Sequence, residues 1–232
     1  MKPDYNGVMN LADLETPFFR RTVAQMERLL AGAPSLYLHP SKRWEYPWAL
    51  RRARLAPGSR VLDGGCGASI FPLFLQQLRC RVAALDPQPP APLDAIQYIC
   101  GELQQLPFAA ESFDAVFCIS VIEHLPVDAM PRALHELARV LKPEGRLLLT
   151  TDFGRRRGEE MWYRGPGPTF RVDWNIFDQK SFEHLIGQAD DLEMDGELEL
   201  AVDWRRMRPL MRRFHGYPYT SLAAAFRKRQ SR

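Results

Sequence analysis

The sequence has no long hydrophobic stretch and no closely spaced cysteines. No run approaches the ~18–20 apolar residues of a membrane-spanning helix, and the first residues, Met1–Tyr5, do not form a secretory signal. The cysteines are 14, 20 and 18 positions apart, which gives neither a CxxC pair nor the spacing of metal ligands. We therefore expect a cytoplasmic protein that binds no metal and no membrane, with four reduced thiols: Cys66, Cys80, Cys100 and Cys118.

The chain also lacks a strong charge of either sign. Its 31 basic and 28 acidic residues give a formal charge of +3 over 232 residues, which is too balanced to predict nucleic-acid binding by itself. Two arginine clusters stand out, at 155–157 and within 205–213. They are candidates for binding an anionic acceptor or a nucleic-acid backbone, although a solvated basic face is the favoured interpretation.

Residues 1–57 are predicted to form an N-terminal helical cap. Apolar residues recur at helical spacing from Leu11 to Leu30, and Thr16-Pro17 should start a second helix within this stretch. An aromatic-rich segment at 41–50 leads into a basic helix that ends before Pro57. We expect these aromatic side chains to be buried, either against the sheet or against a substrate.

Residues 58–232 are predicted to form one main domain, which begins with alternating strand and helix patterns. This alternation is typical of a parallel sheet with right-handed crossovers. The proline-rich link 87–92 should be extended rather than helical. Strands are expected at 59–63, 81–86, 96–100, 113–120 and 146–151, and helices at about 69–78 and from a cap at Asp128 to about Leu141.

The last third of the chain is less regular. Residues 152–175 are rich in glycine, arginine and aromatic residues, and so long an irregular segment predicts a lid or substrate loop. After it we expect a helix at 179–188, a strand around 192–202 and a last strand near 220–226.

Five short motifs then occur in a fixed order. Together they resemble the class I S-adenosylmethionine-dependent methyltransferases over about residues 59–151. The resemblance implies a Rossmann-like α/β fold, with a parallel sheet of order 3-2-1-4-5-7-6 whose last strand is antiparallel, flanked by helices. The motifs are Val61-Leu62-Asp63-Gly64-Gly65-Cys66-Gly67, Leu85-Asp86, Leu106-Pro107-Phe108 with Phe113-Asp114, Glu123-His124-Leu125 and Arg139-Val140-Leu141-Lys142-Pro143-Glu144-Gly145.

The glycine-rich turn carries the prediction of a donor site. Gly65 and Gly67 let the backbone approach a ligand, and the start of the next helix favours a carboxylate. A nicotinamide cofactor is disfavoured because Ile70 occupies the third glycine position of its fingerprint. Ser69 departs from the methyltransferase pattern, which usually has another glycine there.

The resemblance assigns further roles around S-adenosylmethionine. Asp63 would face the ammonium group and Asp86 the ribose hydroxyls. Glu102, where similar enzymes more often carry aspartate, would meet the adenine amino group. The complete set of expected donor contacts is Asp63, Gly64, Gly65, Cys66, Gly67, Asp86, Pro87, Glu102, Leu103, Ile119 and Ser120.

The acceptor side is predicted less directly. His124 and Asp152 follow two strand ends and are candidate catalytic bases, which methyl transfer needs when the acceptor is poorly ionised. His39 and His215 belong to no recognisable motif and are expected to be structural. The expected acceptor wall, for which simple packing is an equally weighted alternative, is Trp44, Glu45, Tyr46 and Trp48.

The favoured prediction is an enzyme that methylates an O, N or C nucleophile of a small molecule. One alternative is a nucleic-acid methyltransferase that uses the arginine clusters, but the base-flipping tetrapeptide is absent after 113–120, where the sequence reads Ser120-Val121-Ile122-Glu123. The other is a non-catalytic subunit that binds the donor. The sequence leaves the oligomeric state open.

Overall fold

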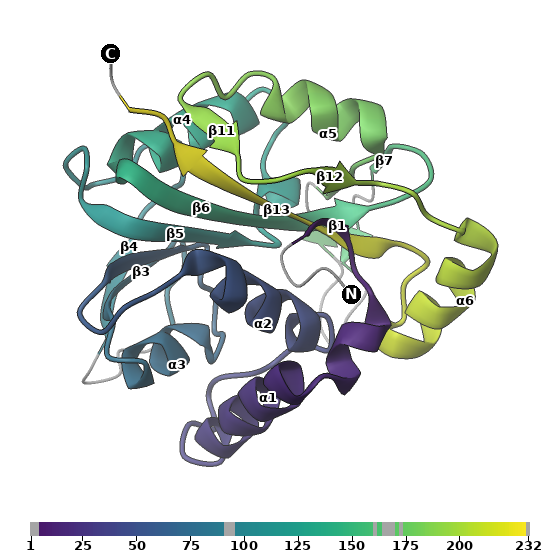
Figure 1. The fold of residues 1–232 in the computed structure, drawn as a ribbon, viewed down its shortest axis with the longest axis horizontal. Coiled ribbons are helices and arrows are strands. Elements are labelled where there is room, and N and C mark those ends of the chain that lie inside the picture. Colours follow the sequence, from purple (N-terminus) through teal and green to yellow (C-terminus); the bar gives the residue numbers. More distant parts are fainter. Residues whose placement is uncertain (1–4, 91–95, 160–161, 164–169, 172–173, 231–232) are drawn as a thin grey trace.

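A central, mostly parallel β-sheet organises the chain (Figure 1). The computed structural model describes residues 5–90, 96–159, 162–163, 170–171 and 174–230. Within these residues the sheet has nine strands, of which eight follow the order β12-β1-β13-β6-β5-β2-β3-β4, while β11 pairs with β13. Their bounds are β1 Asn6–Val8, β2 Arg60–Gly64, β3 Arg81–Asp86, β4 Gln97–Cys100, β5 Phe113–Ile119, β6 Leu141–Phe153, β11 Leu192–Met194, β12 Leu198–Glu199 and β13 Thr220–Lys228.

The predicted strand order is confirmed except at one edge. Strands β4, β3, β2, β5, β6 and β13 take the expected order 3-2-1-4-5-7, and β13 runs antiparallel to β6. The expected single strand at 192–202 is wrong, because β11 and β12 are two short strands and β1 lies between β12 and β13. Gly7 permits this pairing, since a Cβ there would lie 2.4 Å from the carbonyl oxygen of Glu199.

Helices cover both faces of the sheet (Figure 1). Strand β5 supplies both cores: Val116 and Cys118 pack in the cluster of α4 and α5, whereas Ala115 and Phe117 pack in the cluster of α1, α2 and α3. Each large apolar side chain buried in this way contributes about 1.5–3 kcal/mol. The helices are α1 Pro17–Leu30, α2 Lys42–Ala53, α3 Phe71–Gln77, α4 Met130–Val140, α5 Gln179–Ile186 and α6 Trp204–His215, with short 3-10 helices η1 Leu11–Glu15 and η2 Ile122–His124.

Some helix boundaries differ from expectation. The aromatic segment 41–50 lies within α2 despite Pro47 in its interior. Asp128 does not cap α4, which begins at Met130 with Pro131 in its first turn. The basic stretch 205–213 forms most of α6, because Asp203 accepts a hydrogen bond from the Arg205 N–H and caps a helix there.

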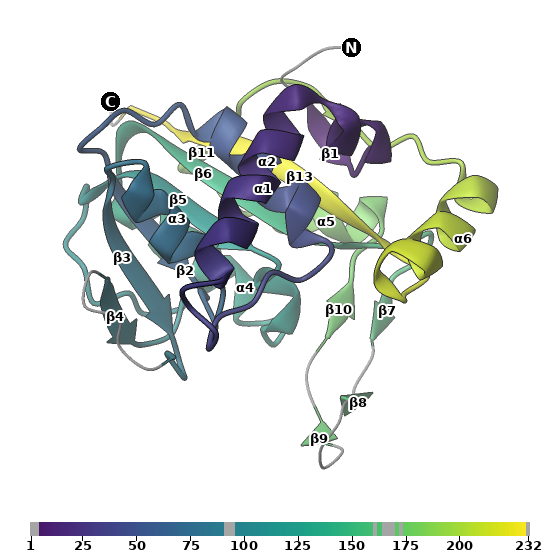
Figure 2. The ribbon, with the colours of Figure 1, turned by 90° about the horizontal axis from the view of Figure 1, so that it is seen from below.

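The segment 152–175 contains more regular structure than expected. Strand β7 Gly158–Glu159 pairs with β10 Asn175–Ile176, and β8 Trp162–Tyr163 pairs with β9 Phe170–Arg171, both antiparallel. Figure 2 shows these pairs extending away from the sheet. The rest of the predicted lid, at 160–161, 164–169 and 172–173, lies outside the described residues, as do 91–95 of the proline-rich link and residues 1–4. The described part of that link, 87–90, is not helical.

Candidate active site

The glycine-rich turn leaves β2 in a conformation that excludes larger residues. Gly65 and Gly67 have φ angles of +80° and +49°. A Cβ on Gly65 would lie 2.4 Å from Val121, whereas a Cβ on Gly67 would meet nothing within 4 Å. The amides of Gly65 and Cys66 both donate to the Leu85 carbonyl, at 2.7 and 3.0 Å, which anchors the turn beside β3. Gly65 is therefore required for packing, while Gly67 leaves backbone open to a ligand.

Two aspartates flank this turn. Asp63 is buried, and no described residue donates a hydrogen bond to its Oδ2. Burial and the neighbouring Asp86 raise the pKa of Asp63 to about 7. Asp86 accepts hydrogen bonds from the amides of Gly67 at 2.9 Å and Gln88 at 2.8 Å. An ammonium group at Asp63 and hydroxyls at Asp86 would satisfy these carboxylates, so the residues present fit S-adenosylmethionine.

The other expected donor contacts have different exposures. Leu103 is buried against the turn, since a Cβ on Gly64 would lie 2.9 Å from its Cδ2. Cys66 and Ile119 are buried as well, whereas Pro87 and Glu102 are exposed.

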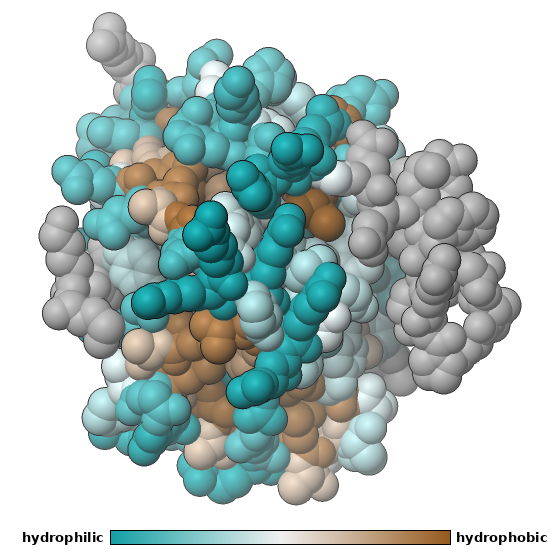
Figure 3. Space-filling model, turned by 90° about the vertical axis from the view of Figure 1, so that its right-hand side faces the viewer, coloured by the Kyte–Doolittle hydropathy of each residue, from teal (hydrophilic) through white to brown (hydrophobic). Residues whose placement is uncertain are grey.

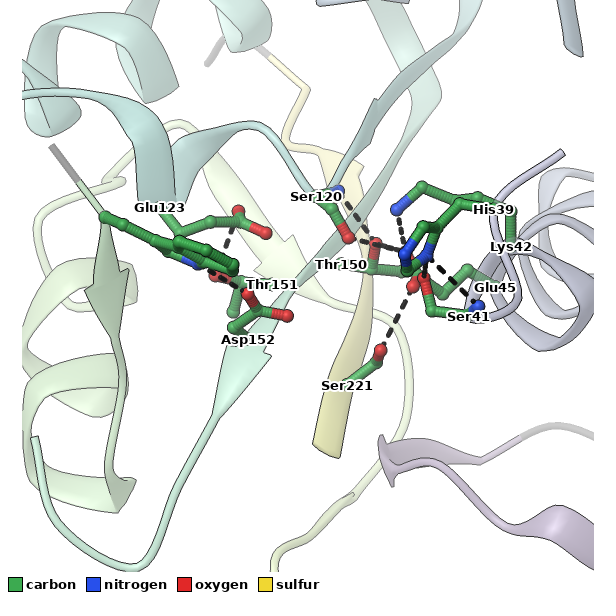
Figure 4. Close-up of polar contacts among 11 residues, drawn as sticks. His39, Ser41, Lys42, Glu45, Ser120, Glu123, Thr150, Thr151, Asp152 and Ser221 are labelled. Carbon is green, nitrogen blue, oxygen red and sulfur yellow. Dashed lines mark hydrogen bonds and ion pairs between the residues drawn. The ribbon is translucent and has the colours of Figure 1, made fainter. Parts of the chain in front are cut away.

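Glu45 joins the cap to the sheet. It is fully buried in α2, and its carboxylate accepts hydrogen bonds from the hydroxyls of Ser120 at 2.7 Å, Thr150 at 2.7 Å and Ser221 at 3.0 Å (Figure 4). The Lys42 ammonium lies 2.9 Å away. Burial alone would raise the pKa of Glu45, but the Lys42 charge and these hydrogen bonds outweigh it and lower the pKa to about 2. Ser120 itself has a left-handed φ of +53°, a conformation that costs a non-glycine residue energy.

A cavity of about 350 Å³ lies beside this network. It opens at the carboxyl ends of β5 and β6, where ligands bind in parallel sheets. Ser120 lines it and, through the end of β5, is also an expected donor contact. The lining residues come from five separate parts of the chain: Tyr37, His39, Ser41, Lys42, Ser120, Glu123, His124, Asp152, Trp174, His215, Tyr217, Tyr219 and Ser221.

Two acidic side chains of the cavity wall form no ion pair with any residue that the structure describes. Glu123 is fully buried; its Oε2 accepts from Thr151 at 3.1 Å, whereas its Oε1 has no donor among the described residues. Asp152 accepts from the indole N–H of Trp174 at 2.7 Å. Figure 4 shows Glu123 and Asp152 together, apart from the Lys42–Glu45 pair. Burial raises the pKa of each carboxyl to about 8, and for Asp152 the charge of Glu123 adds to the effect.

Aromatic rings form the part of the wall next to Asp152. The ring of Trp174 lies edge-on to Tyr217 and Tyr219, with centroids at 5.4 and 5.8 Å. Tyr217 and Tyr219 stack at 5.1 Å, and His215 lies beside both. This wall would contact an apolar or cationic part of a ligand.

The structure separates the residues expected on the acceptor side. Trp44 and Trp48 are buried and stacked on each other, and their indole N–H groups donate to Asp13 and to the Tyr5 carbonyl. Tyr46 stacks on Phe71 in the same core. Of the four residues expected there, Glu45 contacts the cavity wall indirectly: it pairs with Lys42 and accepts a hydrogen bond from Ser120, and both of these line the cavity. His124 is exposed, with its ring 5.8 Å from that of Trp174.

Several wall residues were not predicted. His39 and His215 line the cavity, contrary to the structural role expected for them. Lys42 could have been found from its spacing to Glu45, since positions i and i+3 of a helix are neighbours. The Tyr217-Pro218-Tyr219 sequence is an unusual aromatic pair between α6 and β13, but nothing in it specifies where the rings point.

Two other surface features lie apart from this site. A larger cavity of about 670 Å³ lies between the start of α4 and α5, yet it contains none of the donor motifs. Figure 3, which views the side that carries α6, shows hydrophilic side chains extending over hydrophobic ones. The arginines of α6 are exposed and do not line the 350 Å³ cavity: Arg205, Arg206, Arg208, Arg212 and Arg213.

Similarity to known proteins agrees with this site. Residues 62–149 match the methyltransferase domain family. One relative is an Encephalitozoon cuniculi protein that is named as a methyltransferase. It is 31% identical over 62% of this chain and 69% of its own length. The ubiquinone biosynthesis O-methyltransferase of Xanthomonas oryzae is 35% identical over 52% of this chain, which spans only 54% of that relative.

A solved structure shows the same fold. The 1,6-didemethyltoxoflavin-N1-methyltransferase of Burkholderia thailandensis, crystallised with its acceptor and S-adenosylhomocysteine, has a TM-score of 0.55 and 22% identity over 78% of this chain and 76% of its own. In the described part of the present chain, no helix is both long and apolar enough to cross a membrane. The sequence match, the fold and the glycine-rich turn together show that the chain belongs to the class I S-adenosylmethionine-dependent methyltransferases.

Proposed function

We propose that this enzyme methylates a small molecule bound in the 350 Å³ cavity. The observation that carries the proposal is the position of the cavity at the ends of β5 and β6, where it shares Ser120 with the donor side. A volume of this size suits a small ligand, since such sites are typically about 300–1,000 Å³. Two proteins similar to this chain are named for small molecules, the ubiquinone biosynthesis O-methyltransferase and the 1,6-didemethyltoxoflavin-N1-methyltransferase, which supports the same class of acceptor.

In this proposal Asp152 accepts the proton that the acceptor loses. When bound, S-adenosylmethionine supplies a methyl group on a positively charged sulfur, which a correctly placed nucleophile displaces in line. The carboxyl of Asp152 lies in the cavity wall, is oriented by Trp174 and has a pKa of about 8. A group with a pKa near the working pH is an effective general base. Buried Glu123 would keep that pKa high through its charge.

The remaining parts of the chain would complete the acceptor site. We assign this role to residues 37–45 of the N-terminal cap, 215–221 before and within β13, and the described ends of the 152–175 segment, because all three contribute wall residues. The thiols Cys66, Cys80, Cys100 and Cys118 are all free, which is in keeping with a reducing, cytoplasmic location.

Two measurements test this function. Calorimetry with S-adenosylhomocysteine should give saturable binding that Asp86→Ala weakens at least tenfold, while the exposed control Asp190→Ala leaves it unchanged. Incubation with methyl-labelled S-adenosylmethionine and cell extract should place the label in the small-molecule fraction. Label in RNA, with strongly salt-dependent binding, would contradict the proposal and favour the arginine clusters. Donor binding without any labelled product would favour a non-catalytic subunit.

A further inference from the structure

The Glu123 carboxylate is placed as a ligand-binding group. Glu123 is one of the residues that line the cavity, and its fully buried Oε1 has no donor among the described residues. A buried carboxylate oxygen without a partner has lost its hydration without gaining a hydrogen bond, which is unfavourable. A hydrogen-bond donor on the acceptor would recover this loss, which identifies Glu123 as a contact for an N–H or O–H group.

The charges around the cavity favour a cation over a neutral donor. The Lys42 ammonium is already paired with Glu45 at 2.9 Å. Burial lowers the pKa of both His39 and His215, which favours their neutral forms. The Lys42 charge is a smaller influence on Glu123 and Asp152 than burial, and no described residue forms an ion pair with either carboxyl. Two neighbouring carboxyls inside a wall of low polarity repel each other when ionised, and one bound cation relieves both.

The aromatic wall matches the same ligand. Trp174 donates its indole N–H to Asp152, so its ring lies directly beside the acidic pair. Tyr217 and Tyr219 extend this aromatic surface, with centroids within 5.8 Å of Trp174. Aromatic faces attract an ammonium group, and the attraction is stronger where water is excluded.

We infer that the acceptor is a small amine whose ammonium group binds between Glu123 and Asp152 beside the Trp174 ring, and that its nitrogen is methylated. This inference rests on the proposed small-molecule function. The ammonium transfers one proton to the Asp152 carboxylate, and the nitrogen lone pair then forms the new N–CH₃ bond. The S–CH₃ bond of the donor breaks and its electron pair stays on sulfur, so that the positive charge moves from sulfur to the methylated nitrogen.

Binding of three probes of similar shape tests the inference: phenethylamine, 2-phenylethanol and 3-phenylpropionate. Each is titrated by calorimetry into protein saturated with S-adenosylhomocysteine. Phenethylamine should bind at least tenfold more tightly than 2-phenylethanol, and 3-phenylpropionate should bind most weakly. Glu123→Gln keeps the shape but removes the charge, and should reduce the preference for the amine to less than threefold. The exposed control Glu15→Gln should retain the full preference.

The possible results distinguish failure of the amine site from failure of the proposed small-molecule function. Tighter binding of the alcohol or the carboxylate, an unchanged preference in Glu123→Gln, or no saturable amine binding would each overturn the amine site. Thermal unfolding and donor affinity of the variant, measured in parallel, establish that it is folded. A labelled small molecule that carries the methyl group on oxygen would overturn this inference alone, whereas label confined to RNA or protein would contradict the proposed function as well.

Discussion

The donor side and the acceptor side of this enzyme are built in different ways. The expected donor side is centred on one continuous stretch, β2 and its turn, and depends on backbone conformation at Gly65 and Gly67. The acceptor side collects side chains from α2, the end of β5, the end of β6, residue 174 and the loop before β13. Both contain buried carboxyls that form no ion pair with a described residue, Asp63 on one side and Glu123 with Asp152 on the other. In our proposal each substrate supplies a positive charge to these carboxyls.

The largest expected effect is a loss of catalytic rate, caused by a change on the acceptor side that leaves donor binding intact. Asp152→Asn should lower kcat by roughly 10²–10⁴-fold, because an amide can still accept the Trp174 N–H but cannot take up a proton. Affinity for S-adenosylhomocysteine should stay within twofold of the wild type, because Asp152 lies outside the expected donor contacts. Steady-state kinetics with the identified acceptor and calorimetry with the donor product check both halves. A kcat within a few-fold of the wild type would rule out Asp152 as the base.

The next largest effect concerns thermal stability, which depends on the buried Lys42–Glu45 pair beside the acceptor side. Glu45→Gln leaves the Lys42 ammonium, which is only 14% exposed, without its counter-ion, and breaking a buried pair destabilises by about 3–5 kcal/mol. For a chain of this size that lowers Tm by roughly 6–20 °C. The double variant Lys42→Met/Glu45→Gln should recover most of the loss. Differential scanning calorimetry provides the measurement, and an equal Tm for the single and double variants would show that the unpaired Lys42 charge is not the cause of the loss.

The same contrast explains what could be predicted from sequence. The conformation of the turn was predictable because its residues are adjacent and follow a clear strand pattern. The roles of the turn and of Asp86 toward the donor stay predictions. The acceptor wall was not, because it depends on how distant segments pack. Trp44 and Trp48, expected beside the acceptor, instead fill the core above the sheet. His39 and His215, 176 positions apart, line one cavity. The insertion of β1 into the sheet was likewise missed, because three residues of strand carry too little pattern.

The pH dependence of stability should report the buried carboxyls of both the donor side and the acceptor side. The pKa of Asp63 is raised to about 7 and those of Glu123 and Asp152 to about 8. The native state therefore binds more protons than the unfolded chain between about pH 4 and 8, so that stability is lost as pH rises through this window. Glu45, paired with Lys42, has the opposite sign and loses its contribution only toward pH 2.

Between pH 5 and pH 9 we therefore expect the Tm to fall as the pH rises. The double variant Glu123→Gln/Asp152→Asn should flatten most of this slope, leaving the part due to Asp63. Thermal unfolding monitored by circular dichroism across this range gives the result. A Tm that rises with pH in the wild type would contradict the raised pKa values on both sides of the site.

The smallest expected effect tests the donor side alone. Asp63→Asn should weaken S-adenosylhomocysteine binding about tenfold, or ~1.4 kcal/mol, because a neutral amide cannot balance the ammonium of its amino-acid part. Binding of 5′-methylthioadenosine, which has no amino-acid part, should be unchanged in the same variant. Parallel calorimetric titrations of the two ligands separate this role from a general disturbance of the turn. If both affinities fall equally, the buried Oδ2 of Asp63 supports the turn rather than the ligand, and only Glu123 and Asp152 would remain as carboxyls that await a substrate charge.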